Sequence, residues 1–322
     1  MLLEIFLFVI GLICLIFGGD WFVDGAVGLA KKFHMSELLI GATVVSIGTS
    51  LPEVMVSVTS ASGGQGSIAY GNAVGSVICN TALISALTIA VRPGKVDKKS
   101  LKIPVIFFFI SAGIYLIVSY TTKNFSRYLG IALLAVFVIY ILVNIKQSFN
   151  VEADGAAVSE SGEKAMPLWK SLILLIIGAI LIALGADLLV DNGTLIARGL
   201  GVPETVIALT FIALGTSLPE LVTAISSLIK GHSALSLGNV IGANVFNLVL
   251  VSGLAMTIAP FSLPESSAIA GINASLIVDL PLMVIVMLIL ALPPLIKGKL
   301  YRVQGIILLL MYAAFCVYQF TL

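Results

Sequence analysis

The segment GTSLPE occurs twice in this chain, at residues 48–53 and again at 215–220, each time inside a long apolar stretch. Its two glutamates, Glu53 and Glu220, are 167 positions apart. The same offset relates six further pairs of residues: Asp20 and Asp187, Asp24 and Asp191, Gly71 and Gly238, Asn72 and Asn239, Gly75 and Gly242, and Asn80 and Asn247. The sequence is therefore predicted to consist of two copies of one unit.

The composition indicates an integral membrane protein. Hydrophobic residues make up 59% of the chain and charged residues 10%, whereas a soluble domain has roughly 25% charged residues. The net charge of +1 gives no basis for nucleic-acid binding. Cys14, Cys79 and Cys316 lie in apolar runs without paired spacing, so we expect buried small side chains rather than disulfides or metal ligands.

Ten apolar stretches are long enough to cross a bilayer, since a spanning helix needs about 20 residues. They fall near residues 3–29, 36–61, 67–91, 102–120, 128–146, 168–190, 202–229, 233–259, 268–296 and 302–321. We predict an all-α membrane protein in which residues 1–147 and 167–322 each form a repeat of five transmembrane helices. Residues 148–166 are small and polar and are predicted to form a linker.

The basic residues predict the orientation in the membrane. Of the 17 lysines and arginines, fourteen fall in the odd-numbered loops. These loops, including the linker, should be cytoplasmic, and both termini should lie outside the plasma membrane. Because five spans is an odd number, the second repeat would be inverted relative to the first. Inverted repeats are typical of secondary transporters, whose binding site lies near the midplane where the repeats meet.

The repeated motif carries a distinctive set of oxygen ligands. In the second span these residues share one helical face through spacings of three, four and seven positions: Ser46, Thr49, Ser50 and Glu53. Their counterparts in the seventh span are Ala213, Thr216, Ser217 and Glu220. Pro52 and Pro219 lack an N–H, so both helices should break and leave backbone carbonyls free to line a cavity.

A second polar stripe follows in the third and eighth spans. It consists of Asn72, Ser76 and Asn80, matched by Asn239, Ala243 and Asn247. The glycine pairs Gly71/Gly75 and Gly238/Gly242 form GxxxG patterns. These are predicted to let the stripe pack closely against the broken helices.

The oxygen count suits a hard cation. Calcium takes 6–8 oxygens, and two carboxylates, two carbonyls and an asparagine oxygen supply such a set. The charge of the two glutamates is balanced by one divalent or two monovalent cations. Leaving one glutamate unpaired at the bilayer centre costs at least about 2.5–3.5 kcal/mol, so the empty site is disfavoured and ion exchange is favoured over free uniport. The alternative, a structural pair of protonated glutamates, would leave the accompanying prolines and hydroxyls unexplained.

These motifs resemble the cation/calcium exchanger superfamily, and specifically its microbial sodium/calcium exchanger branch. The two GTSLPE segments are similar to the cores of that family's α-repeats, and GNAVGSVICN (71–80) and GNVIGANVFN (238–247) to their second halves. The resemblance covers essentially the whole chain. It implies electrogenic exchange of sodium for calcium by alternating access, with ion sites on the broken second and seventh helices.

Carried over by position, the resemblance implies a role for each motif residue. Glu53 and Glu220 would bind both ions. Thr49, Thr216, Ser50 and Ser217 would coordinate the ions through hydroxyls or carbonyls. Ser46 and Ala213 would contribute backbone carbonyls, and Ser76 would help to bind sodium. Many family members carry an aspartate at one of the positions filled here by Asn80 and Asn247, so the stoichiometry and the coupling to potassium or protons stay open.

Other functions are less consistent with the sequence. A proton-coupled calcium exchanger is the first alternative. An intramembrane hydrolase would need a base beside Ser50 or Ser217, and no histidine or lysine accompanies them at membrane depth. A cation channel more often uses rings from several subunits. We therefore expect no enzyme and no cofactor, but a monomer in membrane lipid that binds sodium and calcium ions.

The remaining intramembrane acids keep two interpretations each. The aspartates of the first and sixth spans could line an ion access path or pair with groups at the interface: Asp20, Asp24, Asp187 and Asp191. Asp279 in the ninth span has no acidic counterpart, and both an access role and a structural hydrogen-bonding role are open for it.

Overall fold

The computed structural model describes residues 2–153, 166–201, 215–264, 268–269 and 271–321. These residues form an all-α membrane protein in which eight helices are long and apolar enough to cross a membrane. The eight are α1 (Leu2–Lys32), α5–η2–α6 (Gly66–Val91), α7 (Lys98–Tyr120), α8 (Arg127–Ala153), α9 (Leu168–Gly199), α13–η4–α14 (Ser233–Ile258), η5–α15 (Ser275–Lys297) and α16 (Arg302–Thr321).

Two further apolar segments carry the GTSLPE motifs. The first runs from α2 (Glu37–Ile40) through η1 (Gly41–Val45) and α3 (Ser46–Thr49) into α4 (Leu51–Ser62), with a 45° bend between Thr49 and Leu51. The second is the shorter apolar helix α12 (Leu218–Ile229). The first half of the predicted seventh span, residues 202–214, lies outside the described residues.

Several elements in the two halves have the same length and position at the offset of 167. α4 matches α12, and α5 (Gly66–Cys79) matches α13 (Ser233–Phe246), residue for residue. The π-helical segments η2 (Asn80–Ser85) and η4 (Asn247–Val251) follow them, and then α6 (Ala86–Val91) and α14 (Ser252–Ile258). π-Helical turns are rare and frequently occur at functional sites, and these two begin at Asn80 and Asn247.

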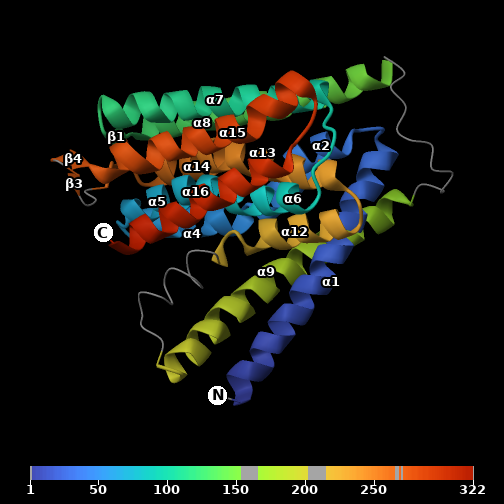
Figure 1. Ribbon diagram of the computed structural model, residues 1–322, viewed down its shortest axis with the longest axis horizontal. Coiled ribbons are helices and arrows are strands. Elements are labelled where there is room, and N and C mark those ends of the chain that lie inside the picture. Colours follow the sequence, from blue (N-terminus) through green and yellow to red (C-terminus); the bar gives the residue numbers. More distant parts are fainter. Residues whose placement is uncertain (1, 154–165, 202–214, 265–267, 270, 322) are drawn as a thin grey trace.

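The helices α1 and α9 form a closely packed antiparallel pair that projects from the rest of the molecule (Figure 1). Glycines make this approach possible: a Cβ at Gly11 would lie 2.9 Å from the Gly185 carbonyl oxygen, and one at Gly18 would lie 3.0 Å from that of Gly178. Because α9 is the counterpart of α1 at the offset of 167, the first helices of the two halves run in opposite directions.

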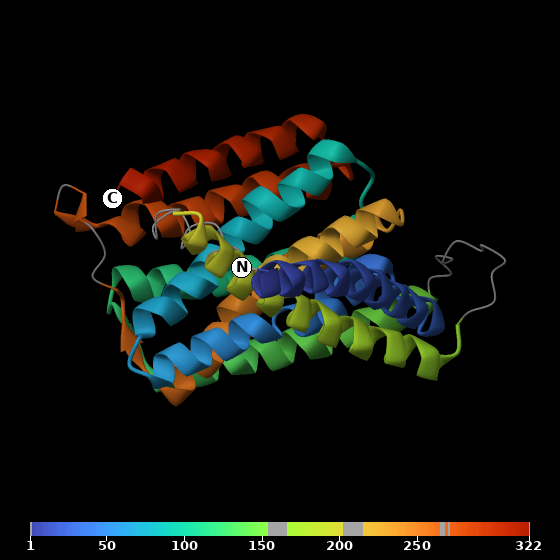
Figure 2. The same cartoon turned by 90° about the horizontal axis from the view of Figure 1, so that it is seen from below.

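The main hydrophobic core lies between α5, α7, α8, α13 and α15. Buried aromatic rings fill it, with Tyr70, Tyr115 and Phe125 in mutual contact and Phe246 against Tyr140. In the view from below, α15 and α16 lie together at one edge of the body (Figure 2).

Short strands join the ends of some helices. The strand β1 (Asn124–Phe125) pairs antiparallel with β2 (Phe261–Ser262), and β3 (Ala268–Ile269) with β4 (Ile272–Asn273). These two-residue strands lie in loops between helices and do not change the all-α class of the fold.

Two predicted boundaries differ from the structure. The helix α8 continues to Ala153, six residues into the range predicted as a linker. The ninth span begins at Ser275 rather than at residue 268. Gly271 there has φ +80, and the Asn273 side chain accepts a hydrogen bond from the Ser275 N–H. A turn followed by a local cap therefore delays the start of the helix.

Candidate ion-binding site

The helix break predicted at the first GTSLPE motif is confirmed. Ser50 has φ −86 and ψ 4, between the end of α3 and the start of α4, and Pro52 is the second residue of α4. Ser217 has nearly the same conformation, φ −91 and ψ 4, directly before α12. Proline is compatible with the first turn of a helix, where no N–H donor is needed, but it cannot continue the preceding one. The helices α4 and α12 therefore each begin just before a motif glutamate, Glu53 in α4 and Glu220 in α12.

Glu53 and Glu220 are completely buried, each with 0% of its surface exposed. Among the described residues, none of their four carboxylate oxygens has a hydrogen-bond partner. The two carboxyl groups lie within electrostatic range of each other. The hydroxyls of Thr49 and Ser50 lie beside the Glu220 carboxylate, short of hydrogen-bond geometry. The two carboxylates, one from each half, are therefore buried within reach of each other's charge.

Further polar groups without partners are buried in the same motifs. The hydroxyls of Ser50 and Ser217 and both side-chain polar atoms of Asn80 and Asn247 are buried without partners among the described residues. Asn80 begins η2, which packs on α12, whereas Asn247 begins η4, which packs on α4. Buried polar groups without partners are costly in protein interiors. Such a concentration is therefore suited to a ligand that supplies the missing interactions.

Two matching hydrogen bonds join the halves at this point. The Thr49 hydroxyl donates to Asn239 Oδ1 over 3.1 Å, and the Thr216 hydroxyl donates to Asn72 Oδ1 over 3.2 Å. The two bonds are equivalent, because Thr216 is the counterpart of Thr49 and Asn239 is the counterpart of Asn72 at the offset of 167. Because each threonine donates its proton to an asparagine, its oxygen lone pairs remain available on the other side.

The roles of Asn72 and Asn239 go beyond what the sequence predicted for the stripe. The Asn72 amide also donates to the Glu53 carbonyl oxygen over 3.1 Å and to the Ser57 hydroxyl over 2.8 Å. The counterpart of Ser57 is Ala224, and the Asn239 amide nitrogen has no partner among the described residues. In the sequence, only the repetition of Asn72 and Asn239 at the offset of 167 indicated that these asparagines bind the motif threonines.

The predicted glycine packing is confirmed in the second half. A Cβ at Gly238 would collide with the Leu38 carbonyl, and one at Gly242 would lie 2.6 Å from the Ala42 Cα. The space left by Gly242 holds the Ser46 hydroxyl, which donates to the carbonyl oxygens of Gly41 and Asn239. The Ser46 hydroxyl is therefore occupied in packing.

The glycines of the first half have no such neighbour among the described residues. Nothing there lies within 4 Å of a Cβ built on Gly71 or Gly75. The counterparts of Leu38 and Ala42 at the offset of 167 are positions 205 and 209, which lie outside the described residues.

The remaining predicted site residues are placed as follows. Ser76 lies on α5 with 5% of its surface exposed. Ala213 lies outside the described residues. Cys79 is buried beside the Ser217 hydroxyl and within electrostatic range of Glu220. Cys14 and Cys316 are only half-buried, so the prediction of buried cysteines is wrong for these two.

Asp279 has a hydrogen-bonding role. Its carboxylate accepts hydrogen bonds from the Ser275 hydroxyl over 2.6 Å and from the Gln319 amide over 3.2 Å. These contacts join the start of the ninth span to α16.

Comparison with known proteins agrees with the arrangement of these motifs. The sequence model of the sodium/calcium exchanger protein family matches residues 3–146 and 170–321. The chain belongs to the sodium/calcium exchanger family. The family is one of ion transporters, and this member is accordingly a cation/calcium antiporter.

Its relatives include proteins of bacteria and archaea. The putative antiporter CaxA of Alkalimonas amylolytica is 33% identical over 100% of this chain and 99% of its own length. The sodium/calcium exchanger MaX1 of Methanosarcina acetivorans is 30% identical over 97% of each chain. The structure of the sodium-calcium exchanger NCX_Mj, soaked with Na+ and Sr2+, superimposes with a TM-score of 0.82 at 33% identity and covers 97% of each chain.

The residue types at the candidate site are those of a hard-cation site. Among the described residues there is no group of three or more histidine, cysteine or acidic side chains that could hold a metal. The candidate site instead combines two carboxylates with neutral hydroxyl, amide and carbonyl oxygens, the ligand type preferred by calcium. A site with only two formal charges also allows release, which transport requires.

Proposed function

We propose that this protein exchanges sodium for calcium by alternating access, with both ions bound between the two halves. The observation that carries the proposal is the fully buried pair Glu53 and Glu220, with all four carboxylate oxygens unpartnered among the described residues. One Ca2+ or two Na+ neutralise this pair, so the ions replace each other without leaving buried charge. Any additional Na+ would bind to the neutral oxygens.

The proposed ligands comprise the carboxylates and the oxygens around them. They are Glu53, Glu220, Thr49, Thr216, Ser50, Ser217, Ser76, Asn80 and Asn247, together with the backbone carbonyls of Ser46 and Ala213. The hydrogen bonds of Thr49 and Thr216 to asparagines support this set, because a threonine that donates its proton keeps its oxygen lone pairs available as acceptors.

We further propose that ten spans form two inverted repeats, residues 1–147 and 167–322, joined by a cytoplasmic linker at 148–166. The matching helix bounds and the antiparallel pairing of α1 with α9 support the inversion. The distribution of lysine and arginine supports a plasma-membrane protein with both termini outside. A monomer is sufficient, since both glutamates come from one chain.

Transport by purified protein in liposomes tests the proposal. Liposomes loaded with sodium and diluted into sodium-free buffer should accumulate calcium, and liposomes loaded with potassium or choline should not. The alternative is proton coupling, which two buried carboxylates would also support by charge. Calcium uptake driven by an imposed pH gradient, and unaffected by sodium, would replace the sodium hypothesis by that alternative.

A further inference from the structure

At one end of the molecule, α1 packs directly on α12. Gly19 of α1 lies against Val222 and Ser226, and a Cβ at Gly19 would lie 2.6 Å from a side-chain atom of each. Ser226 is consequently buried, with 7% of its surface exposed. This end of the interface between α1 and α12 is closed.

An ion pair secures the closed end. Lys230, which follows α12, places its Nζ 2.7 Å from Asp24 Oδ1 and 3.7 Å from Asp20 Oδ1. The same ammonium donates a hydrogen bond to the Asp20 backbone carbonyl over 2.9 Å. The Lys230 side chain is 23% exposed, so the pair is partly shielded from water. Of the two roles that the sequence left open for Asp20 and Asp24, the structure shows pairing.

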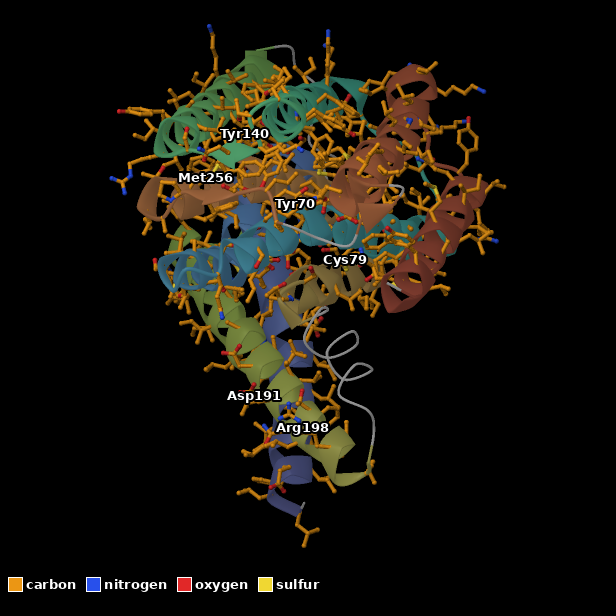
Figure 3. The ribbon with its side chains drawn as sticks, turned by 90° about the vertical axis from the view of Figure 1, so that its left-hand side faces the viewer. Tyr70, Cys79, Tyr140, Asp191, Arg198 and Met256 are labelled. Carbon is orange, nitrogen blue, oxygen red and sulfur yellow. The ribbon has the colours of Figure 1, made fainter. Side chains whose placement is uncertain are left out.

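The equivalent interface in the other half is open among the described residues. At the offset of 167, α9 replaces α1 and α4 replaces α12, and Ala186 replaces Gly19. A hollow of about 200 Å³ lies between these helices, and Ala186, Asp187 and Asp191 line it together with Pro52. The hollow reaches Thr216, one of the proposed ligands. Figure 3 shows Asp191 on the part of α9 that projects from the body.

The open end has no lysine at the position equivalent to Lys230. The equivalent position is Gly63, which has no side chain to reach the aspartates of α9. Gly63 has φ −78 and ψ 7, close to the φ −75 and ψ −4 of Lys230. The two helix ends therefore have the same backbone but carry different charge.

We propose that Lys230 is a latch that holds α1 against α12 and so keeps the ion site open toward Asp187 and Asp191. The inference rests on the alternating-access function proposed above. When two matching repeats exchange their arrangements, α9 closes on α4 while α1 separates from α12. The exchanged state loses the ion pairs of Lys230 with Asp20 and Asp24. It forms no equivalent pair between α4 and α9, because position 63 is a glycine. The equilibrium is therefore biased toward the state described here. With the proposed orientation, the latch is cytoplasmic and the hollow faces outside.

Two matched reporter cysteines measure this bias without transport. Ser226→Cys reports the closed end, and Thr59→Cys reports its exposed counterpart on α4. Each is introduced into protein with Cys14, Cys79 and Cys316 replaced by serine, and reacted with a polar maleimide in lipid nanodiscs that expose both faces. In this background, the cysteine at position 59 should react faster than the one at position 226.

Breaking the latch should change the two rates in opposite directions. Lys230→Ala should raise the reaction rate at position 226 by about fivefold, the upper end for a partly exposed ion pair, and lower the rate at 59. Asp24→Asn should act in the same direction, and Lys230→Arg should retain the original rates. Lys170→Ala removes another positive charge from the same end and should change neither rate.

Moving the latch provides a stricter test. The double variant Lys230→Gly with Gly63→Lys should reverse the preference, since a lysine at 63 meets no atom closer than 3.5 Å at its Cβ. Unchanged rates in Lys230→Ala and Asp24→Asn, or a parallel rise at both positions, would overturn the latch. Failure of the exchange function itself would appear separately, as wild-type liposomes without sodium-driven calcium uptake.

Discussion

At the scale of single residues, the molecule concentrates buried oxygens that lack partners. Glu53, Glu220, Asn80 and Asn247 are all 0% exposed, and none of their side-chain polar atoms has a partner among the described residues. A protein interior normally satisfies such groups. Their accumulation between the halves is the physical basis for the proposed cation site.

Neutralising either glutamate should abolish calcium exchange. Glu53→Gln and Glu220→Gln keep the side-chain shape but remove one charge, and loss of one partner from a buried charge pair costs about 3–5 kcal/mol. Calcium affinity should fall by at least about 100-fold. Radioactive calcium uptake into liposomes measures this, with Glu37→Gln at the start of α2 as the control. Near-normal uptake in either variant would remove that residue from the site.

The two stripe asparagines should differ in their contribution to stability. The Asn72 side chain makes three hydrogen bonds, whereas that of Asn239 makes one among the described residues. At about 1 kcal/mol per bond, Asn72→Ala should destabilise the protein by about 2 kcal/mol more than Asn239→Ala. Thermal unfolding in detergent, followed for both variants, measures the difference. Equal losses would contradict this assignment.

At the scale of elements, close helix contacts depend on missing side chains. Gly238 and Gly242 bring α13 against α2 and η1, and this places Asn239 beside Thr49 and Ser46. The packing of one half therefore positions proposed ligands of the other.

Adding a methyl group at this contact should reduce stability and transport together. A Cβ at Gly242 would lie 2.6 Å from the Ala42 Cα, so the helices must separate. We expect Gly242→Ala to cost about 1–3 kcal/mol through overpacking. Gly113→Ala is the matched control, because nothing described lies within 4 Å of its Cβ and alanine favours helix there. Unfolding temperature and calcium flux in both variants test this, and equal effects would refute it.

The start of α7 should give a measurable pH dependence. Asp97 caps this helix through its contacts with Ser100 and the Lys99 N–H. Partial burial opposes ionisation of Asp97, but the hydrogen bonds from Ser100 and Lys99 outweigh it and lower its pKa. A lowered folded-state pKa stabilises the fold above the ordinary value near about 3.9, and this contribution is lost as pH falls further.

Replacing this cap should remove that pH dependence. Asp97→Ala should cost about 1 kcal/mol at pH 7, a typical value for an N-cap, and less below about pH 3. Thermal unfolding across this range compares the variant with the wild type. A constant difference at all pH values would argue against an ionised cap.

At the scale of the whole molecule, two matching halves are held in different arrangements. α1 is closed on α12 through Gly19 and Lys230, whereas α9 and α4 enclose a hollow that reaches Thr216. A transporter with such halves can present one site to either side of the membrane.

The charge moved per cycle should appear as voltage dependence. The buried pair is neutralised by two Na+, so a third sodium per calcium would carry one net charge across the membrane. Each net charge contributes about 2.3 kcal/mol per 100 mV. Calcium uptake in liposomes clamped with potassium and valinomycin should therefore change with the imposed potential. Voltage-independent flux would indicate electroneutral exchange of two sodium ions for one calcium.

The sequence by itself determined the membrane class, the duplication and the chemistry of the motif. These are local properties: apolar length, the identity of Glu53 and Glu220, and the inability of Pro52 to continue a helix. The tertiary structure decided what depends on contact between distant segments. It showed that Thr49 and Thr216 bond to asparagines of the opposite half, and that Asp279 pairs with Gln319. It also distinguished Asp24, which meets Lys230, from Asp191, which lines a hollow. The offset of 167 makes these two aspartates equivalent in sequence, and only the packing of α1 and α9 against different neighbours separates them.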